Sequence, residues 1–137
     1  MNIKRFVLAS VAVLITLFVL EYLIHGIWLR GIYQGTASAW RPETEIQARM
    51  FLMWLGYLIF TPVFVTIYSK GYEKGKPGFG QGLRYGVLMG LLFSPMSALS
   101  WYTVLPIPGL LGFYWFIGMM AEMLACGIVA GLAYQPD

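Results

Sequence analysis

Four long runs of apolar residues, each interrupted by very few charged side chains, dominate this 137-residue sequence. They cover about residues 6–29, 48–69, 83–104 and 110–134. A helix rises ~1.5 Å per residue, so each run is long enough to cross a ~30 Å hydrocarbon core. Charged residues make up 11% of the chain, well below the ~25% of a soluble domain. The sequence therefore predicts an all-α protein, an integral membrane four-helix bundle that forms a single domain.

Lysine and arginine are distributed unevenly between the connections. Most of them lie in the N-terminal head and after the second run, at Lys4, Arg5, Lys70, Lys74 and Lys76. Because basic connections stay in the cytoplasm, we expect both termini to be cytoplasmic, in a multi-pass protein of the bacterial inner membrane. No basic stripe of the kind that binds nucleic acid is present. The expected partners are the lipid bilayer and other membrane subunits or a second copy of the chain, and not nucleic acid.

The connection after the second run, Lys70–Gln81, is rich in glycine as well as lysine. A phosphate-binding loop would need the Walker spacing of glycines and a preceding strand, and both are missing from the sequence pattern. We interpret this stretch as a flexible cytoplasmic turn that fixes topology.

Small residues recur at every fourth position in the third and fourth runs. The third run has Gly82, Gly86, Gly90 and Ser94. The fourth has Gly118, Glu122, Cys126 and Ala130, which are all small except the acid Glu122. Such stripes let two helices approach closely in lipid. The sequence therefore predicts that these residues form helix-packing faces, with Glu122 turned toward another helix.

Glu21 and His25 lie near the end of the first run, and His25 is the only histidine in the chain. Because they are four residues apart, they share one face of a helix. Two interpretations stay open. The pair either locks the first helix to its neighbours, or it accepts protons or binds a ligand, as ionisable residues inside membranes often do.

Glu122 lies near the middle of the fourth run. A charge at this depth costs ~2.5–3.5 kcal/mol on insertion scales. We therefore expect Glu122 to face inward, to be hydrogen-bonded and to be neutral at pH 7 unless a cation reaches it. The candidate donors are a tyrosine, His25 or the serines of the third run, which are Ser94, Ser97 and Ser100. Structural and functional roles both stay open for this carboxyl group.

Few residues of the sequence could bind a cofactor or a metal. One histidine cannot supply a bis-histidine haem, and methionines at helical spacing, the other possible axial ligands, are typical of packing. We therefore expect neither haem nor pigment at His25. The ligands of a closed zinc site are missing, so no metal is expected, and no nucleophile elbow predicts a hydrolase. Cys126 is the only cysteine, so it cannot form a disulfide within the chain.

Several short motifs, in this order, resemble those of a family of small, uncharacterised four-span bacterial inner-membrane proteins. They are Glu21-Tyr22-Leu23-Ile24-His25-Gly26, Tyr33-Gln34-Gly35-Thr36, Trp40-Arg41-Pro42-Glu43, Gly82-Leu83-Arg84-Tyr85-Gly86 and Pro106-Ile107-Pro108. The resemblance covers most of the chain. It implies the four-span architecture, and it implies no activity.

The sequence favours a small membrane protein without catalysis of its own, which serves as an accessory or structural subunit or as a homo-oligomeric bundle in a membrane complex. The small-residue faces and the absence of a catalytic motif support this interpretation. The alternative is a module that binds or transports a small molecule, a lipid or protons through Glu21, His25 and Glu122.

Overall fold

The computed structural model describes residues 2–136. Its elements in chain order are α1 (Ile3–Glu21), the π-helix η1 (Tyr22–Trp28), α2 (Arg30–Gly35), the 3₁₀-helix η2 (Ala37–Ala39), α3 (Glu43–Lys70), α4 (Gly78–Val104) and α5 (Gly109–Ala133). The described part of the chain contains no β-strand, which confirms the predicted all-α class.

Four helical segments are long and apolar enough to cross a membrane. They are Ile3–Trp28, which joins α1 and η1, and then Glu43–Lys70, Gly78–Val104 and Gly109–Ala133. The number and order of these segments match the four predicted spans. The protein is therefore a multi-pass membrane protein built as a helical bundle.

Three of the long helices begin directly after a proline, at Pro42, Pro77 and Pro108. Each proline carbonyl accepts the first backbone hydrogen bonds of its helix, at N–O distances of 2.9–3.2 Å. Proline suits this place because its fixed φ is compatible with the helix start. An N–H group at this position would have no acceptor within the helix, and proline has no N–H. As a result the third span begins at Gly78 and not at Leu83, where the apolar run begins.

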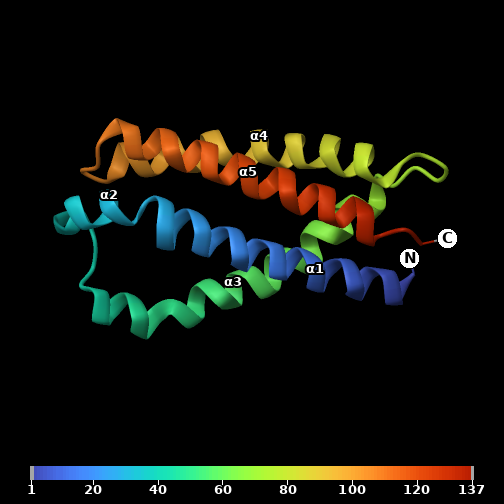
Figure 1. Ribbon diagram of the computed structural model, residues 1–137, viewed down its shortest axis with the longest axis horizontal. Coiled ribbons are helices and arrows are strands. Elements are labelled where there is room, and N and C mark those ends of the chain that lie inside the picture. The colour runs from blue at the N-terminus through green and yellow to red at the C-terminus, as the bar shows by residue number, and fades with distance from the viewer. Residues whose placement is uncertain (1, 137) are drawn as a thin grey trace.

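Figure 1 shows how the long helices are arranged, with α4 and α5 lying along each other, α1 beside α5, and α3 beside α1. Both ends of the chain lie at one end of the bundle, together with the turn between α3 and α4 (Figure 1). The short helix α2 lies at the opposite end. This arrangement agrees with the prediction that the two termini and the basic turn share one side of the membrane.

The contact between α4 and α5 brings two backbones together. The small residues predicted for this face of α4 are all buried, at Gly82, Gly86, Gly90 and Ser94. A Cβ atom added to Gly82 would lie 2.3 Å from the carbonyl oxygen of Gly127, and one added to Gly86 would lie 2.6 Å from that of Met123. A side chain larger than hydrogen is therefore excluded at Gly82 and at Gly86, where the obstacle is backbone.

Two apolar clusters fill the interior. The first joins α1, α3 and α5 near the chain ends, with buried Ala9, Val13, Leu17, Phe64, Val65, Tyr68, Met123, Cys126, Ala130 and Tyr134. The second lies toward α2, with buried Ile24, Leu29, Ile107 and Leu111. Along α1 and η1 the boundary between the clusters falls between Leu17 and Ile24, and Glu21 lies within this interval.

Helix α3 packs through its second half only. Its buried residues are Thr61, Phe64, Val65 and Tyr68. Five consecutive side chains in its first half, Phe51–Leu55, are each 47–59% exposed. Because five consecutive residues cover all sides of a helix, no face of this segment is packed against the rest of the chain.

The turn between α3 and α4, which we expected to be flexible, is held by hydrogen bonds. The Gln81 side chain accepts from the Glu73 backbone N–H at 2.8 Å and donates to the carbonyl oxygens of Glu73 and Lys76 at 3.1 and 2.9 Å. The Glu73 carboxylate pairs with Lys76 and, at 2.6 Å, with Arg84. Hydrogen bonds from these two cations lower the pKa of the Glu73 carboxyl. Gly75 takes the positive φ of 83° that completes the turn.

Candidate functional site

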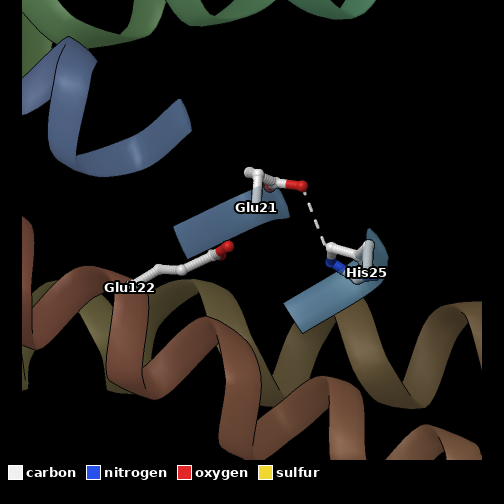
Figure 2. A group of neighbouring side chains, drawn as sticks. All are labelled: Glu21, His25 and Glu122. Atoms are coloured by element: carbon white, nitrogen blue, oxygen red, sulfur yellow. Dashed lines mark ion pairs between the residues drawn. The ribbon is translucent and has the colours of Figure 1, made fainter. Parts of the chain in front are cut away.

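Glu21, His25 and Glu122 meet in one place. Glu21 ends α1, His25 lies in η1, and Glu122 reaches toward them from the middle of α5 (Figure 2). One potential ligand atom from each of the three side chains lies within 4.8 Å of the other two. The three ionisable residues that the sequence predicted as a candidate site, the outermost of them 101 positions apart, therefore lie together.

Glu122 is the most enclosed member of the site. Only 3% of its surface is exposed, and its Oε1 atom has no hydrogen-bond partner among the described residues. Small neighbours on the same face allow α1 and η1 to come close, since a Cβ atom on Gly118 would lie 3.1 Å from Ile24. Glu122 thus faces the first span, with an oxygen atom whose hydrogen-bonding capacity is unused.

The expected serine donors do not serve Glu122. Ser94 Oγ is itself buried without a hydrogen-bond partner in the part of the chain that the structure describes, and Ser100 is exposed. The expectation was wrong because α5 turns Glu122 away from the seam with α4. Of the candidate donors, His25 is the one that the fold brings to this carboxyl group.

Glu21 and His25 form the more accessible side of the site. The His25 Nε2 atom lies 3.6 Å from Oε2 of Glu21, within ion-pair range but longer than a hydrogen bond. The His25 side chain is 38% exposed and the Glu21 side chain is 21% exposed. Tyr57 of α3 lies near the Glu21 carboxylate, and its ring packs edge-on against Phe18 at a centroid distance of 5.4 Å. The pair is thus open on one side while Glu122 closes the other.

The other nitrogen of His25 is held by a tyrosine that the sequence analysis did not select. The Nδ1 atom of His25 lies 2.5 Å from Oη of Tyr33, and Trp115 Nε1 donates to the same oxygen at 2.7 Å. Burial, with smaller contributions from Glu21 and Glu122, raises the pKa of Tyr33 to about 12 against the effect of the Trp115 hydrogen bond. Tyr33 therefore keeps its proton at neutral pH and orients the imidazole ring from α2.

An aromatic group supports Tyr33 from outside. Trp40 packs edge-on against Tyr33 and Trp115, with centroid distances of 5.5 and 5.9 Å. Its indole N–H donates to Thr36 Oγ1 at 2.9 Å. This packing fixes the connection between the first two spans over the end of the site nearest α2.

The backbone that carries His25 is a π-helix. The Leu29 N–H donates to the carbonyl oxygen of Ile24, five residues earlier, at 2.8 Å. Such wider turns are rare and are often found at functional sites. Here the π-helix carries His25 between the first span and the fold-back of α2, and it leaves Leu29 fully buried.

Tyr33, Tyr57 and Trp115 contribute to the site without having been predicted. The sequence held one partial signal for Tyr33, because it follows His25 closely within a polar connection. Trp115 lies 82 positions from Tyr33, and only the folded bundle brings it near.

The arrangement combines two carboxylates and one imidazole, which can accept protons or bind a cation. No lysine or arginine forms an ion pair with Glu21 or Glu122 among residues 2–136. A scan against family models, a search of curated proteins and a search of solved structures each gave no match for this chain. The resemblance to the four-span bacterial family stays a prediction, and the function is argued from the site alone.

Proposed function

We propose that this protein is a membrane-embedded binding module whose ligand is a cation held by Glu21, His25 and Glu122. One observation carries the proposal, namely the buried Oε1 atom of Glu122, which has no hydrogen-bond partner in the described chain and belongs to a carboxyl group that lies beside a second carboxylate and an imidazole. Of the two functions that the sequence left open, this geometry favours the binding module.

The charge balance of the site supports a cation as the ligand. Two carboxyl groups close together in a low-dielectric interior cannot both be ionised without a compensating positive charge. His25 supplies at most one such charge. A bound cation would compensate the remaining charge and would also use the free oxygen of Glu122.

Thermal unfolding of the purified, tag-free protein in mild detergent tests the proposal. The wild-type protein is compared with Glu122→Gln after removal of bound ions by a chelator, and then with added Na⁺, Ca²⁺, Mn²⁺ or Zn²⁺. A ligand at 100 times its Kd stabilises a protein by about 2.7 kcal/mol. We expect at least one of these cations to stabilise the wild-type protein by this order of magnitude and to leave the variant unchanged.

Glu45→Gln is the matched control, because Glu45 is exposed and pairs with Arg41 and Arg49 at the surface. This variant should respond to cations as the wild-type protein does. If no cation stabilises the wild-type protein more than Glu122→Gln, the proposed function is wrong.

A second function, as an interaction subunit, has an observation of its own. The segment Phe51–Leu55 is apolar and about half exposed on every side. Helices of other membrane subunits, or of a second copy of this chain, would bury it, whereas lipid would cover it without specificity. This is the function that the sequence favoured, and it is compatible with a bound cation.

Disulfide cross-linking in lipid nanodiscs or native membranes tests this second function. In a Cys126→Ser background, we expect Met53→Cys to form a cross-linked species and Leu132→Cys, on an exposed position of α5, to form none. Equal cross-linking at both positions would indicate random collision, and its absence at both would show that no second copy of the chain contacts this part of α3.

The side of the membrane on which the termini lie also belongs to the proposal. Lys and Arg in the N-terminal head and in the turn after α3 favour the cytoplasmic side for that end of the bundle, and both termini lie at that end (Figure 1). Accessibility of Ser38→Cys and Lys74→Cys to a membrane-impermeant thiol reagent tests it in a Cys126-free background. Labelling at position 38 from the periplasm, and at position 74 only after permeabilisation, is expected, and the reverse pattern would refute it.

A further inference from the structure

We propose that the cation is a divalent transition-metal ion of the zinc class, bound by His25 Nε2 and by one carboxylate oxygen each from Glu21 and Glu122. This inference rests on the proposed function and names its ligand. Imidazole nitrogen is a preferred ligand of Zn²⁺, Co²⁺ and related ions, whereas Ca²⁺ and Mg²⁺ prefer oxygen alone. The presence of the only histidine of the chain in this site therefore decides between the two groups of metals.

The distances are close to those of a metal centre. With metal–ligand distances of ~2.0–2.2 Å, tetrahedral ligand atoms lie about 3.4 Å from one another. The Glu21 oxygen and the His25 nitrogen are already 3.6 Å apart, and all three candidate atoms lie within 4.8 Å. To reach the separation of a tetrahedral centre, the Glu122 oxygen must therefore approach the other two ligand atoms by at most about 1.4 Å.

The unused oxygen of Glu122 is the second observation that points to a ligand. This side chain is 97% buried, as its 3% exposure indicates, and it points at Glu21 and His25 (Figure 2). A carboxylate in a structural hydrogen-bond network would have its acceptors satisfied within the protein. A carboxylate that binds a metal keeps an oxygen free of other partners until the ion arrives.

The hydrogen bonds behind His25 match those of metal-ligating histidines. Such residues usually donate their second ring N–H to an oxygen, and this fixes the tautomer and aims the other nitrogen at the metal. In the metal-bound state Nδ1–H of His25 donates to Tyr33 Oη, which lies 2.5 Å away and also accepts from Trp115. The lone pair of Nε2 then faces Glu21. Tyr33 is therefore a positioning residue and not a ligand.

The proposed centre has three protein ligands, so at least one coordination position is left for water or another small molecule. Three protein ligands with an open position are typical of reactive metal sites, whereas structural zinc sites are closed by four. The exposed side of the His25–Glu21 pair is the side from which a fourth ligand can approach. The metal thus supplies the positive charge that the two carboxylates need, and it stays accessible to a fourth ligand.

Cobalt is the probe, because four- or five-coordinate Co²⁺ absorbs visible light much more strongly than Co²⁺ in water. Chelator-treated, tag-free protein in detergent is titrated with CoCl₂, and ZnCl₂ is then added as competitor. We expect one Co²⁺ per chain, an intense visible band, and loss of the band on addition of Zn²⁺. Glu122→Gln and His25→Gln should abolish the band, while Glu45→Gln should leave it unchanged.

Tyr33→Phe separates a positioning role from ligation. It should keep the shape of the cobalt band and weaken the affinity about 10–100-fold, as expected for the loss of a residue that orients a ligand. Circular dichroism of each variant checks that it is folded. Because Glu122→Gln and His25→Gln alter different helices, misfolding of one leaves the other to decide.

The possible outcomes separate this inference from the function on which it rests. If the wild-type protein gives no intense cobalt band, or if His25→Gln gives the same band and affinity, the transition-metal assignment is wrong. Stabilisation by Ca²⁺ or Na⁺ that depends on Glu122 would then leave the cation-binding function standing. If no cation stabilises the protein through Glu122, both proposals fail together.

Discussion

Helix α5 faces two neighbours, and the two contacts are of opposite kinds. Toward α4 it presents glycine and backbone, so that a Cβ atom on Gly86 would lie 2.6 Å from a carbonyl oxygen of α5. Toward α1 and η1 it presents Glu122, with a buried oxygen that has no partner in residues 2–136. One face of the helix is closed by contact between backbones, and the other leaves polar atoms available.

This difference teaches how a small bundle can be stable and still hold a site. Close backbone contact gives dispersion energy that lipid cannot replace. With α4 and α5 joined in this way, the contact with the first span can include unpaired polar groups without loss of the fold. The predictions below test the α4–α5 contact first and the polar contact afterwards.

The largest effect is expected at the seam between α4 and α5. Gly86→Leu places a side chain against the backbone of α5, which cannot move aside as a flexible side chain could. We expect a loss of about 3 kcal/mol in the free energy of unfolding, at the upper end of overpacking effects. Gly80→Leu on the same helix is the control, because nothing lies within 4 Å of a Cβ atom there. Equal stability of the two variants in detergent would contradict the described seam.

The next effect concerns the support of His25. Tyr33→Phe removes the oxygen to which Trp115 donates at 2.7 Å. Leaving a part-buried donor unsatisfied costs about 1–3 kcal/mol, and we expect the free energy of unfolding to fall by this amount. Tyr114→Phe is the matched control, since Tyr114 packs on Trp28 through its ring. If both variants unfold at the same temperature, the hydrogen bonds of Tyr33 contribute nothing to stability.

A smaller effect of opposite sign is expected within the polar contact. In chelator-containing buffer the two carboxyl groups cannot both be ionised, and keeping one of them protonated at neutral pH costs free energy. Glu122→Gln is neutral without that cost, so we expect stability to rise by on the order of 1 kcal/mol. In the Glu21→Gln background the same substitution should give no such gain, since the repelling partner is gone. Additive effects of the two substitutions would show that Glu21 and Glu122 do not interact.

The smallest effect is expected outside both contacts, at the turn before α4. Lys76 and Arg84 lower the pKa of the Glu73 carboxyl in the folded state. A lowered folded-state pKa gives stability that is present above the unfolded-state pKa and is lost as the pH falls through the folded-state pKa. The difference in Tm between the wild-type protein and Glu73→Gln should therefore shrink between pH 7 and pH 3. Lys74→Gln, which lies outside these ion pairs, should show no such trend, and a growing difference for Glu73→Gln would refute the sign.

The sequence predicted the features that depend on periodicity and composition. Four spans, the small-residue face around Gly86 and the inward orientation of Glu122 all follow from patterns within single helices. The sequence named His25 among several candidate partners of Glu122 but could not select it over the serines of the third span. That selection depends on the rotation of α5 between its neighbours, and both faces of α5 carry small residues.

The π-helix, and the contact between Tyr33 and His25 that depends on it, also could not be predicted from the sequence. In the largely apolar run Tyr22–Trp28, apolar residues occur on every side of the helix. The hydrophobic periodicity therefore does not distinguish α-helical turns from wider ones. The wider turns and the fold-back of α2 bring Tyr33 to His25. No metal was expected from the sequence because the ligands of a closed four-coordinate site are missing, and the three-ligand centre proposed above is of the open kind.

The site joins the first span of the chain to the last, and this has a consequence for biogenesis. When the first span enters the bilayer during synthesis, Glu21 and His25 arrive long before Glu122 leaves the ribosome. Until then Glu21 lacks the neighbouring carboxyl group of Glu122, and Tyr33 lacks the hydrogen bond from Trp115. The first helix therefore enters the membrane with polar groups whose later neighbours have not yet been synthesised. The fourth span therefore completes the site in one step, and a chain truncated before α5 would lack both Glu122 and Trp115.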